Sequence, residues 1–157
     1  MSIKPIANHN RLSVIQFFKE HWGSTQMIIS SGTFDCTQLD GYIYETDDVI
    51  LGLLTYVVHE DALEVISLDS IQEGHGIGTQ LMHAVEVLAK EIGLEKITLI
   101  TTNDNLAALK FYQKRGYRIV TVIPGAVAEA RRIKPTIPLI GNDDIPLHDE
   151  LLLQKHL

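Results

Sequence analysis

Three stretches of the chain repeat apolar residues at the three- and four-residue steps of an amphipathic helix. The first covers Arg11 to His21, with Asn8 or Asn10 as its cap and with one apolar face made of Leu12, Ile15, Phe18 and Trp22. The second follows Gly78 and ends near Gly93, which suits a left-handed C-terminal cap; its stripe is Leu81, Met82, Val85, Leu88, Ala89 and Ile92. The third opens at Asn103-Asp104-Asn105, runs through Lys114 and stops at Gly116.

β-Prone runs between these helices predict strands. They are Ile3–Ile6, Gly41–Glu45, Val49–His59, Leu63–Leu68, Lys96–Thr102, Tyr117–Ile123 and Glu150–His156. The stretch from Gly23 to Asp40 predicts no defined element, and Gly125 to Pro146 predicts mostly irregular chain. This order predicts the mixed α/β (α+β) class around one sheet, and 157 residues fit a single domain, 1–157.

Composition and charge exclude several classes of protein. The net charge of −7 argues against a nucleic-acid binder, whose affinity rests on cationic side chains. No apolar run reaches the ~18 residues of a membrane span, and the N-terminus lacks a signal-peptide stretch, so we expect no membrane partner and a cytoplasmic location. The only cysteine is Cys36, which excludes an intrachain disulfide, and the histidines show no metal-ligand spacing, which predicts no metal.

The clearest chemical signal is a glycine-rich loop between a strand and a helix. Gly74, Gly76 and Gly78 lack Cβ atoms, so the backbone can approach a ligand closely. The free N–H groups at the start of the next helix then favour a phosphate. A plain tight turn is the alternative. The G-x-G-x-G spacing differs from the dinucleotide-binding fingerprint, and no Gly-Lys-Ser/Thr follows to make a P-loop.

A second motif runs from Asn105 to Tyr117, one helix and one strand further on. Glu73 through Leu81 resembles the pyrophosphate loop of the GNAT acetyltransferase superfamily. Asn105 through Tyr117 resembles that family's Asn-x-x-Ala-x-x-x-Tyr-x-x-x-Gly-Phe helix. The resemblance covers Gly41 to Val122 and implies an acetyl-CoA-dependent N-acetyltransferase with a twisted, mostly antiparallel sheet flanked by helices. The chain is similar to an uncharacterised branch of the family with a C-terminal extension.

The resemblance implies a set of cofactor contacts. Main-chain amides of the loop would bind the CoA pyrophosphate, from Gly74, His75, Gly76, Ile77, Gly78 and Thr79. The end of the preceding strand would pair with pantetheine and offer an N–H to the thioester carbonyl, from Leu68, Asp69 and Ser70. Asn105 would hydrogen-bond the CoA arm. Glu73 departs from the family's usual Arg or Gln and adds no attraction for pyrophosphate; His75 either compensates with a donor or is a solvated loop residue.

The resemblance also implies two catalytic side chains. Tyr112 would protonate the leaving thiolate, and packing of its ring in the core is the alternative. Glu64 would take the proton of the attacking amine; a solvated strand carboxylate is the alternative, and Asp69 is a weaker rival for the role.

The acceptor is expected to be a small-molecule or peptide amine, and the sequence does not identify it. A homodimer is compatible with the resemblance. The segment Gly125–Pro146, with Arg131, Arg132 and Lys134, either walls the acceptor site or is a solvated face. The rival function is a catalytically silent acyl-CoA-binding or regulatory module on the same fold.

Overall fold

The computed structural model describes residues 2–22, 24–72 and 74–157. The chain divides into two compact units, which are described separately. Unit 1 is formed by the chain up to Met27, by Phe34–Ile97 and by Leu157, and unit 2 by Ile28–Thr33 and Thr98–His156. Both units combine strands with helices, and the strand pairs β1–β4, β4–β5, β5–β6 and β8–β9 are all antiparallel, which confirms the predicted fold class.

The sheet of unit 1 places four strands side by side in the order β1 (Ser2–Pro5), β4 (Asp40–Thr46), β5 (Val49–Val58) and β6 (Leu63–Ser70). These are the predicted strands, with ends that move by one or two residues. The β4–β5 turn at Asp47 and Asp48 has φ angles of 51° and 61°. Two successive positive φ angles match the twist of a tight hairpin.

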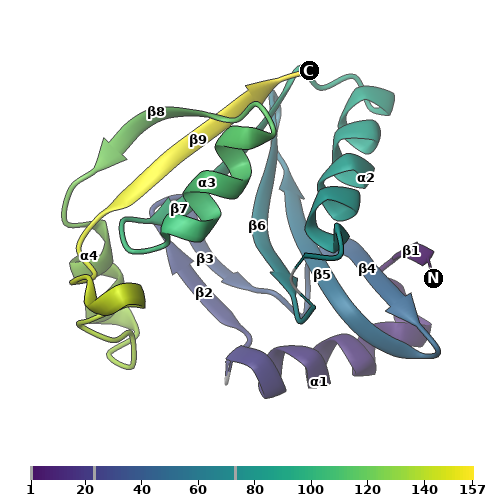
Figure 1. The fold of residues 1–157 in the computed structure, drawn as a ribbon, viewed down its shortest axis with the longest axis horizontal. Helices are drawn as coiled ribbons and strands as arrows, with labels where there is room; N and C mark the ends of the chain where they lie inside the picture. Colours follow the sequence, from purple (N-terminus) through teal and green to yellow (C-terminus); the bar gives the residue numbers. More distant parts are fainter. Residues whose placement is uncertain (1, 23, 73) are drawn as a thin grey trace. The chain divides into compact units, whose positions relative to one another are not determined.

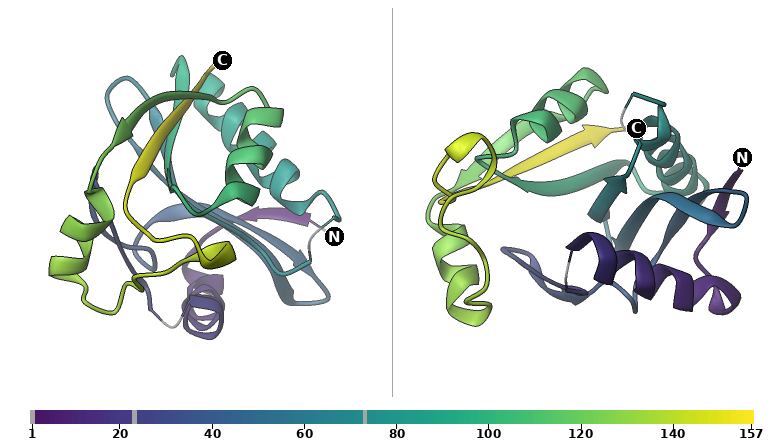
Figure 2. Two further views of the ribbon diagram at one scale, coloured as in Figure 1. Left: turned by 60° about the vertical axis from the view of Figure 1, so that its left-hand side comes forward. Right: turned by 60° about the horizontal axis from the view of Figure 1, so that its bottom comes forward.

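Two helices pack on opposite faces of this sheet (Figures 1 and 2). They are α1 (Arg11–Trp22) and α2 (Ile77–Glu91). The predicted stripe of α2 is confirmed for its buried members, Leu81, Met82, Val85 and Ala89. Gly93 has φ 84°, as expected of a left-handed residue after the helix, whereas Ile92 is 49% exposed.

The buried face of α1 differs from the predicted one. Leu12 is 81% exposed and lines a surface groove of about 430 Å³, and Ile15 is only half-buried. The Trp22 side chain lies outside the described part of the chain. Phe18 of the predicted stripe is buried as expected, and the helix otherwise packs through two residues outside that stripe, Val14 and Phe17.

Two short elements lie where the sequence predicted none. Residues 8–10 form a 3₁₀ turn, in which Asn10 accepts a hydrogen bond from the Ala7 N–H at 2.8 Å instead of capping α1. The stretch from Gly23 to Asp40 contains a hairpin, β2 (Gln26–Ile29) and β3 (Gly32–Asp35).

Unit 2 orders its strands as β7 (Lys96–Thr102), β9 (Glu150–His156) and β8 (Arg118–Ile123). The predicted bounds of β7 and β9 are confirmed without change. α3 (Leu106–Lys114) lies along this sheet, and α4 (Ala126–Ile133) follows β8 (Figure 2). Helix α4 corrects the prediction of irregular chain: Gly125 begins it in a left-handed conformation, and Ala126, Val127 and Ala130 bury one side.

No helix within the described ranges is long and apolar enough to cross a membrane.

Candidate functional site

In unit 1 the carboxylate of Glu64 is buried in the first half of β6, with the whole residue only 3% exposed. Its Oε1 lies 2.8 Å from Nε2 of His59, which follows β5 and has a side chain that is 45% exposed. The His59 N–H donates to the carbonyl of Ala62 and closes the β5–β6 turn. Glu64 is therefore a buried carboxylate held by an imidazole, not a solvated strand residue.

A β-bulge follows Glu64 within β6. Thr55 pairs with Ser67 and Tyr56 with Val65, so Ile66 is an extra residue opposite β5. The buried hydroxyls of Thr55 and Ser67 lie 2.6 Å apart and fix the two strands on one side of the bulge. A bulge bends its strand and turns a backbone group out of the ladder. Sequence reasoning missed it, because no Gly or Pro marks the position.

Beyond the bulge the strand becomes regular again. Leu68, Asp69 and Ser70 pair with Leu54, Leu53 and Gly52 of β5, so β5 occupies one edge of β6 up to its end. Any pantetheine pairing with these three residues must therefore use the opposite edge.

The glycine loop joins β6 to α2. Gly74 and Gly76 have φ angles of 80° and 72°, a region that disfavours residues with a Cβ. Among the described residues, no atom lies within 4 Å of a Cβ added at either glycine, so the loop faces open space. Glu73, whose charge departs from the family pattern, lies outside the described residues, and His75 is exposed.

The N-terminus of α2 is suited to an anion. Gly76 is its N-cap without a side-chain hydrogen bond, and the first turn, all of it described, contains no acidic residue. The N–H groups of Ile77, Gly78 and Thr79 therefore lie at the positive end of the helix dipole, where an anion is favoured.

Gly52 of β5, which the sequence analysis did not identify, allows this helix to pack closely on the strand. A Cβ on Gly52 of β5 would lie 2.4 Å from Cγ2 of Ile77 and 3.1 Å from Cδ1 of Leu81. The first turn of α2 thus packs directly on the backbone of β5. A glycine inside an apolar strand was the available signal.

In unit 2, α3 carries the second group of predicted residues. Asn105 is its N-cap and accepts a hydrogen bond from the Ala108 N–H at 3.2 Å, which leaves its amide nitrogen as the donor group. Tyr112, two turns later, is 8% exposed and stacks edge-on against Phe111 and Tyr117, with ring centroids 5.3 and 5.8 Å away. The Tyr112 ring therefore packs against neighbouring rings, and this packing fixes the direction of its hydroxyl group.

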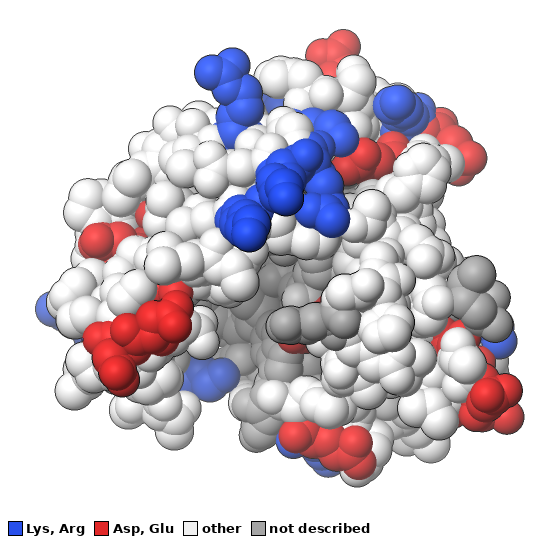
Figure 3. Space-filling view, viewed as in Figure 1, with Lys and Arg blue, Asp and Glu red and all other residues white. Residues whose placement is uncertain are grey.

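Cationic side chains gather over the region of α3 (Figure 3). This helix and the residues after it carry Lys110, Lys114, Arg115 and Arg118. Arg115 is held over the Phe111 ring at 3.6 Å and donates to the Phe111 carbonyl at 2.8 Å. The local charge of α3 is thus positive in a chain of net charge −7.

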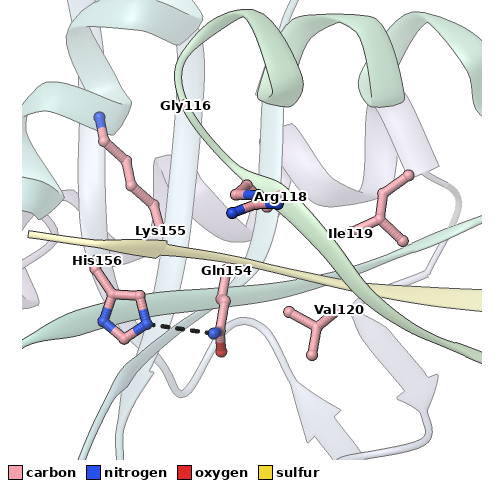
Figure 4. Close-up of a pocket in the computed structure, with 7 residues that line it drawn as sticks. All are labelled: Gly116, Arg118, Ile119, Val120, Gln154, Lys155 and His156. Atoms are coloured by element: carbon pink, nitrogen blue, oxygen red, sulfur yellow. Dashed lines mark hydrogen bonds between the residues drawn. The ribbon is translucent and has the colours of Figure 1, made fainter.

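A hollow of about 460 Å³ lies on β8 and β9 in unit 2 (Figure 4). None of the predicted site residues lines it; its wall is Gly116, Arg118, Ile119, Val120, Gln154, Lys155 and His156. Within the part of the chain that the structure describes, no group of three or more His, Cys, Asp or Glu side chains is placed to hold a metal ion.

The structure thus groups Glu64, the bulge and the glycine loop along β6 and α2 of unit 1, and Asn105 and Tyr112 along α3 of unit 2. Two tyrosines of unit 1 are also perturbed. Burial, with a smaller effect from the neighbouring Tyr42 and Asp40, raises the pKa of Tyr56 to about 12. Burial, with a smaller effect from Glu91, also raises the pKa of Tyr42.

Comparison with known proteins gives consistent matches. A model of the acetyltransferase (GNAT) family matches residues 11–117. The chain is 51% identical over 158 aligned positions to the uncharacterized protein YxbD of Bacillus subtilis (strain 168), covering 100% of this chain and 99% of that one.

Two solved structures share the fold. An IAA acetyltransferase from Bacillus cereus ATCC 14579 has a TM-score of 0.75 at 18% identity, covering 99% of each chain. A GNAT family acetyltransferase from Elizabethkingia anophelis with acetyl-CoA bound has a TM-score of 0.72 at 19% identity, covering 99% of this chain and 97% of that one.

Proposed function

We propose that this chain, which belongs to the acetyltransferase (GNAT) family, transfers the acetyl group of acetyl-CoA to an amine by direct attack. The observation that carries the proposal is the loop before α2. Among the residues that the structure describes, none fills the space beside two left-handed glycines, and the first turn of the following helix contains no acidic residue. Such a loop binds a diphosphate through its amides. The acetyl-CoA bound to the similar Elizabethkingia protein supports the same cosubstrate here.

The rest of the cofactor would follow β6. Pantetheine would pair with the backbone of Leu68, Asp69 and Ser70 on the edge away from β5. A backbone N–H released near the bulge at Ile66 would polarise the thioester carbonyl, as donors of an oxyanion hole do. The amide nitrogen of Asn105 would donate to the CoA arm, and the cations of α3 would favour the cofactor's phosphates.

The proposed reaction then needs one base and one acid. The free amine attacks the thioester carbon, and the base, Glu64, takes its proton. The carbon–sulfur bond breaks, and Tyr112 gives its phenolic proton to the departing thiolate. Burial of Glu64 and the fixed ring of Tyr112 support these roles, since a group held in place transfers protons efficiently.

We propose that both units form one acetyltransferase domain, because the family match at residues 11–117 includes residues of each. The acceptor amine is proposed to be a small molecule or a peptide, with the segment 125–146 forming a wall of its site. A cytoplasmic location stays a prediction from the sequence.

A homodimer is proposed through the free edge of β8. This strand ends the sheet order, and Ile119, Val120 and Val122 are 45–50% exposed. Residues 119–123 read Ile-Val-Thr-Val-Ile, which is the same in both directions. A second copy can therefore pair antiparallel about a two-fold axis at Thr121, with like residues meeting like. The bulge between Ile119 and Thr121 falls inside this stretch, so the ladder is expected to be short.

The function is tested with acetyl-CoA and a panel of putrescine, spermidine, tyramine, free amino acids and a short lysine-containing peptide. Release of free thiol reports transfer, and thermal shift with CoA, ATP and NADH reports the cofactor, since a ligand of the folded state raises Tm. We expect CoA alone to give a large shift. Tight CoA binding with no transfer to any amine would favour the silent module, and equal shifts from ATP and CoA would reject the cofactor.

A further inference from the structure

The contact between Glu64 and His59 joins a buried acid to a solvent-exposed base. The Glu64 side chain is 4% exposed, whereas the His59 side chain is 45% exposed, and the Oε1–Nε2 distance is 2.8 Å. A base has to lose its proton to water after every turnover. The Glu64 side chain has little solvent exposure, whereas its imidazole partner is open to solvent.

The contact also determines which ring nitrogen is the basic one. When Glu64 is ionised, its carboxylate only accepts hydrogen bonds, so the proposal takes Nε2 of His59 as the nitrogen that carries the hydrogen. In a neutral imidazole the lone pair then belongs to Nδ1. The same logic operates wherever a buried carboxylate orients a histidine that acts as a base.

We propose that His59 Nδ1, oriented by Glu64, is the atom that takes the proton of the acceptor amine. This inference rests on the proposed acetyl transfer and changes the role of Glu64 from a lone base to the group that fixes and stabilises the imidazole. The amine nitrogen forms its bond to the thioester carbon, and an N–H bond of that nitrogen breaks. The proton joins Nδ1, directly or through one water, and the exposed imidazolium later returns it to solvent.

Several charged side chains lie around His59. Glu60 and Asp61 lie on the same turn, and Glu64 faces the ring from β6. The nearby cation, Lys96 of β7, is 3.5 Å from Asp61 and pairs with that carboxylate.

Two variants separate this inference from a lone Glu64 base. His59→Gln retains an N–H that can hold Glu64 in place but has no atom that accepts the amine's proton. We expect it to lower kcat about 10²-fold on the best amine of the panel, the low end for a lost general base. His59→Ala should recover part of that loss when imidazole is added to the buffer. His83→Gln on the exposed side of α2 is the matched control and should keep the wild-type rate.

The pH dependence of turnover separates a catalytic role of His59 from a purely structural one, because a structural role would not change that dependence. Protonated His59 cannot accept a proton, so the ratio of wild-type to His59→Gln turnover should shrink as the pH is lowered. Long-range ¹⁵N–¹H spectra of the labelled protein test the geometry without any substrate. They should show Nε2–H in the wild type and a mixture of both tautomers in Glu64→Gln.

The outcomes are distinct. An Nδ1–H tautomer in the wild type would contradict the inference, because Nδ1 would then have no lone pair to accept the proton. A wild-type rate in His59→Gln, with a loss in Glu64→Gln, overturns it and leaves acetyl transfer with Glu64 as the base. If the wild type acetylates no amine of the panel, the proposed function and this inference both fall.

Discussion

Gly76 and Gly125 offer a comparison in which backbone strain is the same and only the location differs. Each is a left-handed N-cap, with φ and ψ of 72° and 12° at Gly76 and of 71° and 6° at Gly125. No described atom lies within 4 Å of a Cβ added at either position. Alanine therefore meets no clash in either case, and Gly76→Ala and Gly125→Ala should differ only where a ligand binds.

The stability cost can be worked out for both variants. A left-handed conformation costs a residue with a Cβ about 1–2 kcal/mol. The loss of backbone freedom in the unfolded chain returns about 0.5 kcal/mol of this. The net loss is about 1 kcal/mol, which lowers the Tm of a chain of this length by about 2–4 °C. Since the strain is equal, the two decreases in Tm should agree within error.

Binding should separate the two variants. At Gly76 the added methyl enters the space of the proposed pyrophosphate site, and we expect the Kd for CoA to rise at least about tenfold, a loss of about 1.4 kcal/mol. Gly125→Ala should bind CoA as the wild type does. Titration calorimetry with CoA measures both. Equal affinities in the two variants would refute the assignment of the phosphate site to this loop.

Three further changes test other parts of the molecule. Tyr112→Phe should keep the fold and the CoA affinity but lower kcat by about 10²–10⁴, measured as thiol release; a wild-type rate would exclude the phenol as the acid. Because folding raises the pKa of Tyr56 from its usual 10 to about 12, its contribution to stability is complete below pH 10 and is lost as the pH rises to 12. Urea unfolding across this window should show a steeper loss in the wild type than in Tyr56→Phe. Thr121→Lys would place two cations at the proposed two-fold axis and should give a monomer by light scattering, whereas Thr136→Lys, also exposed, should not change the mass.

Elements with one strong pattern could be predicted from the sequence. The strands Lys96–Thr102 and Glu150–His156 match the structure, and the helix predicted to follow Gly78 begins slightly earlier, at Ile77. In these elements, strict alternation or a single helical stripe permits only one arrangement. Helix α1 contains two overlapping stripes with helical spacing. Leu12 belongs to the one that the sequence favoured, yet it is 81% exposed, because packing against β5 selects the face with Val14 and Phe17. Tertiary contacts, not periodicity, decide between two such faces.

The candidate site shows a similar division. The positions of the glycine loop, Asn105 and Tyr112 in their elements could be predicted from motif spacing, because these positions depend on local backbone geometry. The bulge at Ile66 and the partner of Glu64 depend on the register between β5 and β6, which a single sequence does not express. His59 lies five residues before Glu64 and meets it only because the β5–β6 turn reverses the chain between them.

The chain that follows α4 was the least predictable part, because polar contacts and not an apolar pattern hold it in place. Arg131 donates to the carbonyls of Ile137, Pro138 and Leu147 at 2.8–3.3 Å, so this arginine holds backbone together and does not form a solvated face. Asp104, 4% exposed, accepts from the backbone and side-chain nitrogens of Asn142 at 2.8 and 3.1 Å.

The Asp104 carboxylate also explains why residue 141 is a glycine. A Cβ on Gly141 would lie 2.1 Å from the Asp104 carboxylate, so a larger residue fits only if that buried, hydrogen-bonded carboxylate moves. Asp104 directly precedes Asn105, the cap of α3. Within unit 2 the segment is therefore tied to the start of the helix that carries the proposed CoA and thiolate contacts. A segment anchored in this way has the fixed position that a wall selecting among amines requires, since a mobile loop would impose no shape on the acceptor.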